Sequence, residues 1–287
     1  MSTAEFDAFG PWIDEVRTVD GLPRLYRDAG IDPAEYRLVL KVPRDIERRN
    51  ANPGMHLYDY LIALDEKTLT VLSRQDDRYD EVRLPLDRIA AIEDSVRLLN
   101  GRLIIHTVDG TAVVVSYNGS ANAPVRDLIR MIRRWYLPDA PPPDDAVIPE
   151  FEPRLAREDT GLLTDLRHLL AREPGMRPLH LAERRPVIAA STWERLYRRI
   201  WPLVLHASIV VTDGAEIQII HRRDWFTAPG DDLSLARTVL PRSRISRLTV
   251  QDHDRYLGIH VITVEAGAAC LRFPAPAGPF TEALRRQ

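Results

Sequence analysis

Short alternations of apolar and polar residues dominate the chain and predict β-strands more often than helices. Thr68 to Leu72 alternates threonine with leucine and valine, and Leu103 to Val108 is rich in β-branched residues. Val113 to Tyr117 continues this pattern. A period of two with β-branched residues is typical of strands that have one buried face. We therefore expect a mainly β protein.

Glycine-containing dipeptides between these runs predict tight hairpin turns. Asp109-Gly110 separates two predicted strands, and both residue types tolerate the positive φ angles of a type I′ turn. Equivalent turns are expected at Asp213-Gly214, at Ala266-Gly267 and at Asn100-Gly101. The strands on either side of each turn are then antiparallel neighbours.

Helical spacing is confined to a few segments. Val125, Leu128, Ile129, Ile132 and Trp135 form one apolar stripe, and Phe280 with Leu284 forms a shorter one. Further short helices are expected over Leu22 to Ala29 and Gly161 to Arg172, each followed by an extended segment, Tyr36 to Val42 and Arg177 to Leu181. Each half of the chain is thus predicted to run from a short helix through strands to a closing helix.

The two halves also repeat each other. Leu84 to Ile89 (LPLDRI) matches Leu240 to Ile245 (LPRSRI) at four of six positions. Residues 61–65 match 209–213 upstream, while 101–108 match 258–264 and 113–117 match 269–273 downstream, in the same order. The second copy has extra residues around Trp225 to Leu235, which we expect to form a loop because proline, glycine and two aspartates cluster there.

This order of elements resembles the pleckstrin-homology (PH) superfold, in particular the bacterial PH-like and GRAM-like domains. The residues that carry the resemblance are Leu84 to Ile89 and Leu240 to Ile245, over roughly residues 36–137 and 177–287. Trp135 stands where PH domains place a helical tryptophan, but the second copy has no tryptophan after Pro274. The resemblance implies an α+β, mainly β fold of two tandem, partly open antiparallel barrels, each closed by a C-terminal helix. PH-like folds bind phosphoinositides, peptides or proteins, so the fold selects no single function.

A proline-rich acidic segment divides the 287 residues into two domains. Residues 138–153 hold six prolines and five acids, which favours an extended linker. The expected domains are residues 1–137, with an N-terminal helical extension, and residues 154–287, with a leading helix. The first carries 19 basic and 22 acidic residues and the second 20 and 15, so the second domain is basic.

Candidate chemistry is sparse. Cys270 is the sole cysteine and lies among small apolar residues, so we expect a buried, unreactive thiol. The eight histidines form no HExxH pair; His106 and His260 match each other within predicted strands, and Asp252-His253-Asp254 is predicted to be a solvated turn. We expect no metal site, no cofactor and no catalysis. The start of the chain has no basic or apolar signal region, which favours the bacterial cytoplasm.

Ser191 to Trp201 (STWERLYRRIW) predicts a basic, aromatic-rich amphipathic helix. Ser191 and Glu194 have capping-box spacing, and five apolar side chains from Trp193 to Trp201 fall on one face. The favoured interpretation is that this face packs on the core of the second domain while the arginines are solvated. The alternative is a partner surface, formed by Arg184, Arg185, Arg195, Arg198, Arg199, Arg242, Arg244 and Arg247.

Two classes of function follow. The first is a non-catalytic intracellular binding or scaffolding protein that recognises a protein, a peptide or an anionic group. Arginines alone would give anionic lipid only a weak, salt-sensitive contact, at about 1 kcal/mol each. The alternative is an enzyme whose site is assembled at the interface of the two halves. A nucleic-acid partner is not expected, because the basic half has no recognition helix and no aromatic pair of the ribonucleoprotein type.

Overall fold

Antiparallel sheets make up most of the chain. The computed structural model describes residues 4–136, 155–230 and 232–285. Strands hold 43% of these described residues and helices 27%, which confirms the expected α+β, mainly β class. The predicted linker, residues 138–153, lies outside the described residues.

The described residues fall into two compact units, and neither is one uninterrupted half of the chain. The first unit takes the described residues of Met1–Ile89, Leu98–Ile105 and Ala112–Asp139. The second takes those of Ala90–Arg97, His106–Thr111 and Ala140–Gln287. Two segments that precede the expected linker therefore belong to the second unit.

The first unit is built on a five-stranded antiparallel meander. Its sheet has the order β1-β2-β3-β4-β5 and comprises β1 (Asp14–Glu15), β2 (Leu38–Pro43), β3 (Tyr58–Leu64), β4 (Thr68–Gln75) and β5 (Arg78–Pro85). The same unit holds the short helix α1 (Ala4–Ala8), most of β7 (Asn100–Thr107), β8 (Ala112–Asn118) and α2 (Ala123–Tyr136). As predicted from its spacing, α2 buries Val125, Leu128 and Ile132.

The prediction of a helix over Leu22 to Ala29 is wrong, because only the 3-10 turn η2 (Arg24–Tyr26) forms there. Tyr26 is fully buried in the core of the first unit, and its hydroxyl donates to the Asp59 carbonyl at 2.8 Å. Burial raises the pKa of this phenol well above its ordinary value. The tertiary contact of one tyrosine thus fixes a turn where local spacing suggested a helix.

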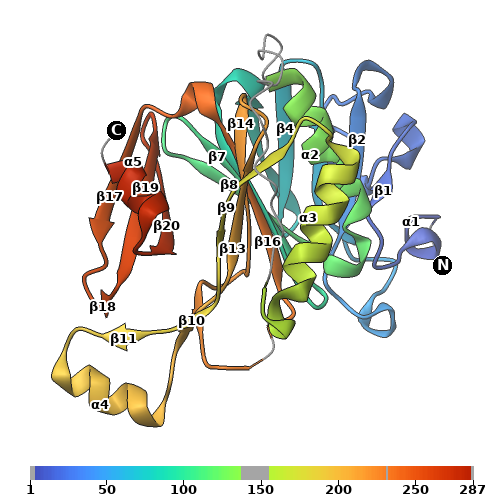
Figure 1. Cartoon of the computed structure of the whole chain (residues 1–287). Coiled ribbons are helices and arrows are strands. Elements are labelled where there is room, and N and C mark those ends of the chain that lie inside the picture. Colours follow the sequence, from blue (N-terminus) through green and yellow to red (C-terminus); the bar gives the residue numbers. More distant parts are fainter. Residues whose placement is uncertain (1–3, 137–154, 231, 286–287) are drawn as a thin grey trace. The chain divides into compact units, whose positions relative to one another are not determined.

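The second unit pairs a strand of the first half of the chain with strands of the second half. β6 (Ile89–Arg97) lies antiparallel to β16 (Leu235–Pro241), from Ile92 opposite Val239 to Val96 opposite Leu235. The sheet continues through β14 (Glu216–His221) and β13 (Ser208–Thr212) to β9 (Arg177–Ala182). Figure 1 shows these strands with helix α3 (Thr160–Arg172) alongside them.

Two apolar clusters support this sheet. In one, α3 packs Leu162, Leu166 and Leu169 against Ile209 and Ile220 of the strands. The other lies at the three-stranded sheet of β17 (Arg247–Asp252), β19 (Ile259–Ala266) and β20 (Ala269–Pro276), which is followed by α5 (Pro279–Arg285). The helices predicted at the start and the end of the second half, α3 and α5, are therefore present.

The order of elements repeats as the sequence predicted. β5 leads through the 3-10 turn η5 (Leu86–Arg88) into β6, and β16 leads through η8 (Arg242–Arg244) into β17. The two Leu-Pro-x-x-Arg-Ile blocks thus occupy the same place, at the end of four consecutive antiparallel strands and before three more. The superposition of the two repeats as PH-like barrels stays a prediction.

Most of the expected turns are confirmed. Gly110, Gly214 and Gly267 all adopt positive φ angles at hairpin turns, and a Cβ atom on Gly267 would lie 2.2 Å from the Val108 carbonyl oxygen. The turn expected at Asn100-Gly101 is wrong, since β7 begins at Asn100 and the chain turns at Leu98-Leu99. Two exposed leucines carry no turn signal, so local chemistry did not identify them.

Two further expectations in the second half need correction. Cys270 is exposed, because strand β20 alternates and places Ala269 and Leu271 inward and the thiol outward. The inserted segment around Trp225 to Leu235 is not all loop, because it contains the short strand β15 (Phe226–Thr227). Period-two alternation, rather than the apolar character of neighbouring residues, decides which side chains are buried.

Candidate functional site

A helical arm extends from the second unit between β9 and β13. It consists of β10 (Arg185–Pro186), β11 (Ile188–Ala189), α4 (Thr192–Ile200) and β12 (Val204–Leu205). Figure 1 shows α4 at one end of this unit, beyond β10 and β11. No counterpart of this arm exists among the described residues of the first repeat, as the sequence comparison indicated.

Short strand pairs hold the base of the arm. β10 pairs with β12, β12 pairs with β15, and β11 pairs with β18 (Tyr256–Leu257). Between them, Val187, Leu205, Tyr256 and Ile259 form a small buried cluster. The position of α4 is thus fixed by strands on both sides of the helix rather than by the helix itself.

The polar stripe of α4 faces these strands. The Glu194 carboxylate accepts hydrogen bonds from Arg255 at 2.6 Å and from Arg198 at 3.3 Å. Arg198 also lies 3.5 Å from the Tyr256 hydroxyl. The bond from Arg255, together with that from Arg198, holds the pKa of the Glu194 carboxyl below its ordinary value. The expected capping box is wrong: Ser191 is the N-cap but makes no side-chain cap bond, and the Glu194 carboxylate accepts from the two arginines instead.

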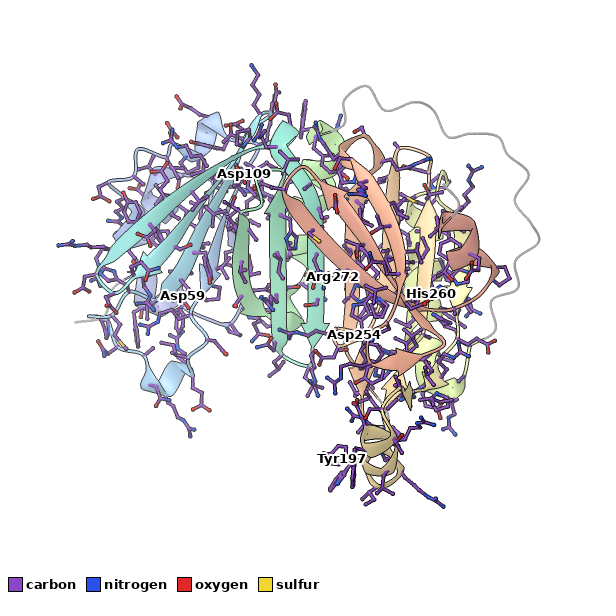
Figure 2. The ribbon with its side chains drawn as sticks, turned by 90° about the vertical axis from the view of Figure 1, so that its left-hand side faces the viewer. Asp59, Asp109, Tyr197, Asp254, His260 and Arg272 are labelled. Atoms are coloured by element: carbon purple, nitrogen blue, oxygen red, sulfur yellow. The ribbon has the colours of Figure 1, made fainter. Side chains whose placement is uncertain are left out.

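The apolar stripe of α4 is exposed, so the expectation that it packs on the core is wrong. No residue of the helix is buried. Trp193 is 83% exposed, Ile200 72% and Trp201 63%, and Leu196 and Tyr197 are more than half exposed. In Figure 2 the labelled Tyr197 lies at the end of the unit and points away from the sheets. The helix is attached through its ion pairs, which turns the aromatic side chains towards solvent.

Two more apolar side chains lie on the strand pair from which α4 begins. Ile188 and Leu257 face each other across β11 and β18, and each is more than half exposed. With aromatic side chains of about 150–250 Å² each, the stripe of α4 alone presents roughly 600 Å² of apolar surface, at the upper end of what monomers expose. We call the following seven residues the apolar tip: Ile188, Trp193, Leu196, Tyr197, Ile200, Trp201 and Leu257.

The structure places the eight candidate arginines at three locations. Arg195 and Arg199 are exposed on α4, on the side away from the aromatic stripe, while Arg198 is held by Glu194. Arg184 and Arg185 lie at the base of the arm and donate to backbone carbonyls. The remaining three, Arg242, Arg244 and Arg247, lie at or before the start of β17, whose far end leads to β18 beside the arm. A six-residue strand spans about 20 Å, so the last three do not join the surface of α4.

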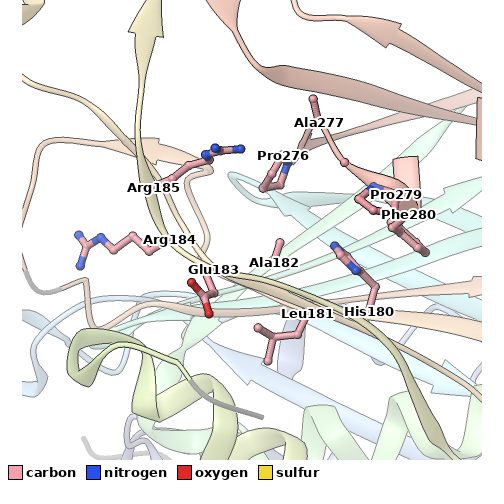
Figure 3. Close-up of a pocket in the computed structure, with 11 residues that line it drawn as sticks. His180, Leu181, Ala182, Glu183, Arg184, Arg185, Pro276, Ala277, Pro279 and Phe280 are labelled. Carbon is pink, nitrogen blue, oxygen red and sulfur yellow. The ribbon is translucent and has the colours of Figure 1, made fainter. Parts of the chain in front are cut away.

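A cavity of about 340 Å³ lies between the end of β9 and the start of α5. His180 lines it and stacks on Phe280 with ring centroids 4.2 Å apart, and burial lowers the pKa of the imidazole. Glu183, Arg184 and Arg185 also line the cavity, but Figure 3 shows Arg184 extending away from His180. The labelled polar groups therefore do not converge on one point.

A buried polar cluster of the second unit escaped sequence analysis. His206 Nε2 lies 2.7 Å from the Thr227 hydroxyl and 3.8 Å from the Asp232 carboxylate, and burial, aided by Arg184, lowers the pKa of His206. Nearby, Arg222 pairs with the buried Asp159 at 3.4 Å. These residues are dispersed along the chain with no spacing signal, so only the fold could bring them together.

This cluster does not have the geometry of a nucleophile relay. In such relays the acid binds one imidazole nitrogen and the hydroxyl binds the other. Here both Thr227 and Asp232 face Nε2 of His206, and Nδ1 is buried without a hydrogen bond among the described residues. The cluster instead connects the segment after β12, strand β15 and the segment before β16.

The remaining titratable candidates have structural surroundings. His106 and His260 lie in strands β7 and β19 as predicted, and His260 contacts the Thr281 hydroxyl at 2.8 Å. In the Asp252-His253-Asp254 segment, His253 packs near Tyr256 while Asp254 is exposed. Within residues 4–136, 155–230 and 232–285, no group of three or more ligand-type side chains is placed to hold a metal ion.

No known protein family, curated protein or solved structure matches this chain. Among the described helices, none has the length and apolar character needed to cross a bilayer. The apolar tip is therefore the feature of the described residues that best indicates a function.

Proposed function

We propose that this protein is a non-catalytic binding protein that attaches to anionic membrane surfaces through its apolar tip. The observation that carries the proposal is the exposure of the whole apolar stripe of α4, including two tryptophans and a tyrosine. A soluble surface rarely presents so much contiguous apolar area without a partner. The element order of each repeat supports a PH-like scaffold behind the tip, in the expected cytoplasmic setting.

The chemistry of the tip favours lipid. Tryptophan and tyrosine have apolar rings with one polar group, which suits the boundary between headgroups and acyl chains. Arg195 and Arg199 lie on the opposite side of the helix, where they can reach lipid phosphates while the aromatic face is inserted. The one acidic residue of α4, Glu194, is neutralised by two arginines and adds no net repulsion. The helix has the arrangement of an interfacial amphipathic helix.

Burial of the aromatic face adds to the binding free energy that the arginines alone would supply. If half of roughly 600 Å² leaves water, the gross gain is about 7 kcal/mol at about 25 cal/mol per Å². Exposed arginines add about 1 kcal/mol each near an anionic surface. Arginines alone would be too weak, but the sum supports reversible attachment.

A second copy of this chain is a less suitable occupant. Two tips that met face to face would leave Arg195 and Arg199 of both copies on the outer sides of the contact, where neither arginine has a role in it. A groove in a different protein is the competing occupant, and the experiment below separates it from lipid.

Co-sedimentation with vesicles tests the proposal. Wild-type protein is mixed with vesicles of phosphatidylcholine alone and of phosphatidylcholine with phosphatidylglycerol, at low and physiological salt. We expect binding to the anionic vesicles and a blue shift of tryptophan emission. W193A with W201A should weaken binding at least tenfold, since each buried large side chain contributes about 1.5–3 kcal/mol. R195Q with R199Q should remove the preference for anionic lipid and the salt dependence.

Trp12 supplies a matched control, because it is also more than half exposed but lies outside the tip. W12A should bind as the wild type does. Wild-type protein that stays in the supernatant at low salt would reject lipid and leave a protein groove as the occupant of the tip. Equal binding by wild type and the double tryptophan variant would reject the tip as the site.

The alternative function is an enzyme, and the buried His206 cluster is the observation that favours it. A broad screen for hydrolase and phosphatase activity tests this alternative. Turnover that disappears in H206Q while the far-ultraviolet circular dichroism is retained would overturn the non-catalytic assignment. We expect no such turnover, because both polar partners of His206 face the same ring nitrogen.

A further inference from the structure

Strand pairing in the second unit joins two different positions of the repeat. β6 follows the first Leu-Pro-x-x-Arg-Ile corner, and β16 precedes the second. They pair over five consecutive residues, from Ile92 opposite Val239 to Val96 opposite Leu235. The strand after one corner thus pairs with the strand before the other.

The same two positions occur once more in the chain. β17 follows the second corner as β6 follows the first, and β5 precedes the first corner as β16 precedes the second. Among the strand pairs of the described residues, β5 has β4 as its partner and β17 has β19, so each lies at the edge of its sheet. β5 and β17 are therefore two edge strands that occupy the same positions in the repeat as the paired strands β16 and β6.

We propose that β17 of one copy pairs with β5 of a second copy, in the register that β6 and β16 use. To transfer this register, we align the two Leu-Pro-x-x-Arg-Ile blocks, so that Leu84 corresponds to Leu240 and Ile89 to Ile245. It places Leu248 opposite Arg83, Thr249 opposite Val82 and Asp252 opposite Tyr79. This inference rests on the strand edges and is independent of the apolar tip.

The side chains are compatible with this register. No two like charges are directly opposite, and the pair of Thr249 and Val82 joins two β-branched residues, which is a favourable cross-strand combination. Val82 is 38% exposed, so an apolar β-branched residue faces solvent in the middle of the β5 edge. A sheet edge presents backbone donors and acceptors that a partner strand can satisfy.

The contact is head to tail, because each chain contributes β5 to one neighbour and β17 to another. Such heterologous contacts either close into a ring or continue into longer assemblies. Pairing over about five residues predicts a weak association that grows with protein concentration.

Cysteine cross-linking tests the register. In a C270S background, one chain carries V82C and another carries T249C. Directly opposite Cβ atoms in an antiparallel pair lie about 4.5–5.5 Å apart, close enough for a disulfide after a small adjustment. We expect a disulfide-linked dimer in the mixture of the two variants, several-fold more than in either variant alone.

V114C supplies the matched control, because Val114 of β8 is also 38% exposed. Mixed with T249C, it should give several-fold less dimer than V82C does. Equal cross-linking by V82C and V114C, or none by either, would overturn the proposal. A chain carrying both V82C and T249C that forms its disulfide only within a monomer would also overturn it, because the two edges would then pair inside one molecule.

Discussion

The buried imidazole of His221 should make the stability of the protein depend on pH below neutrality. His221 is the last residue of β14 and stacks on Trp225 with ring centroids 4.4 Å apart. Its Nδ1 lies 2.7 Å from the Arg222 carbonyl, so this nitrogen donates, and Nε2 can accept from the Thr238 hydroxyl at 3.0 Å. Both nitrogens are thus satisfied in the neutral ring, and burial lowers the pKa of His221 to about 4.

The sign and size of the effect follow from proton linkage. Above the unfolded-state pKa of about 6.5 the histidine is neutral in both states and has no effect on the pH dependence. Between about pH 6.5 and 4 the unfolded chain binds a proton that the folded protein excludes, so the free energy of unfolding falls as the pH falls. From pH 7.5 to 5 the loss is about 2 kcal/mol from this one group. Below about pH 4 the contribution becomes constant.

Urea unfolding followed by tryptophan fluorescence measures this loss. The unfolding free energies of wild type and H221Q are compared at both pH values; H221Q starts lower at pH 7.5 but should lose about 2 kcal/mol less on acidification. H168Q is the matched control, because His168 is exposed on α3 and its substitution removes no buried imidazole. Identical pH dependence in wild type and H221Q would refute the assignment of a buried neutral imidazole.

Three further predictions concern single positions. G101A should lower the free energy of unfolding by roughly 1–3 kcal/mol in urea titrations, because its Cβ would lie 2.3 Å from the buried Tyr117 ring; an unchanged midpoint would contradict the contact. L98N should raise stability by about 1 kcal/mol, because Leu98 has a φ of 56° and asparagine tolerates this conformation better; lower stability would show that the leucine side chain outweighs the strain. Cys270 should react fully with Ellman's reagent in the native protein, since it is exposed; protection until unfolding would show that the thiol is covered.

Much of the fold could be predicted because its signals are local. Strand alternation, glycine turns and the stripe of α2 each depend on residues that are close in sequence. The failures have two different causes. Tyr26 fixes a 3-10 turn by reaching Asp59, a tertiary contact that no local pattern contains. Cys270 is exposed because of its place in the alternation of β20, a local pattern that the apolar character of its neighbours concealed.

The candidate site shows the same division. The helix around Trp193 was predicted correctly, but the direction of its aromatic face was not. That direction depends on Arg255, which lies far along the chain and binds Glu194. The proximity of His206 and Asp232 could likewise not be predicted from the sequence, because the distance between these two residues depends on the completed fold.

The pairing of β6 with β16 has a consequence for how the chain is made. β6 leaves the ribosome roughly 140 residues before its partner, which at about 5–20 residues per second is a delay of roughly 7–30 seconds. During that time β6 lacks β16, the strand beside which it lies in the completed sheet. If the protein were cut at the proline-rich segment, β6 would lie on one fragment and β16 on the other, so that neither fragment alone could form this strand pair. Two fragments made together in one cell should therefore recover more folded protein than either one made alone.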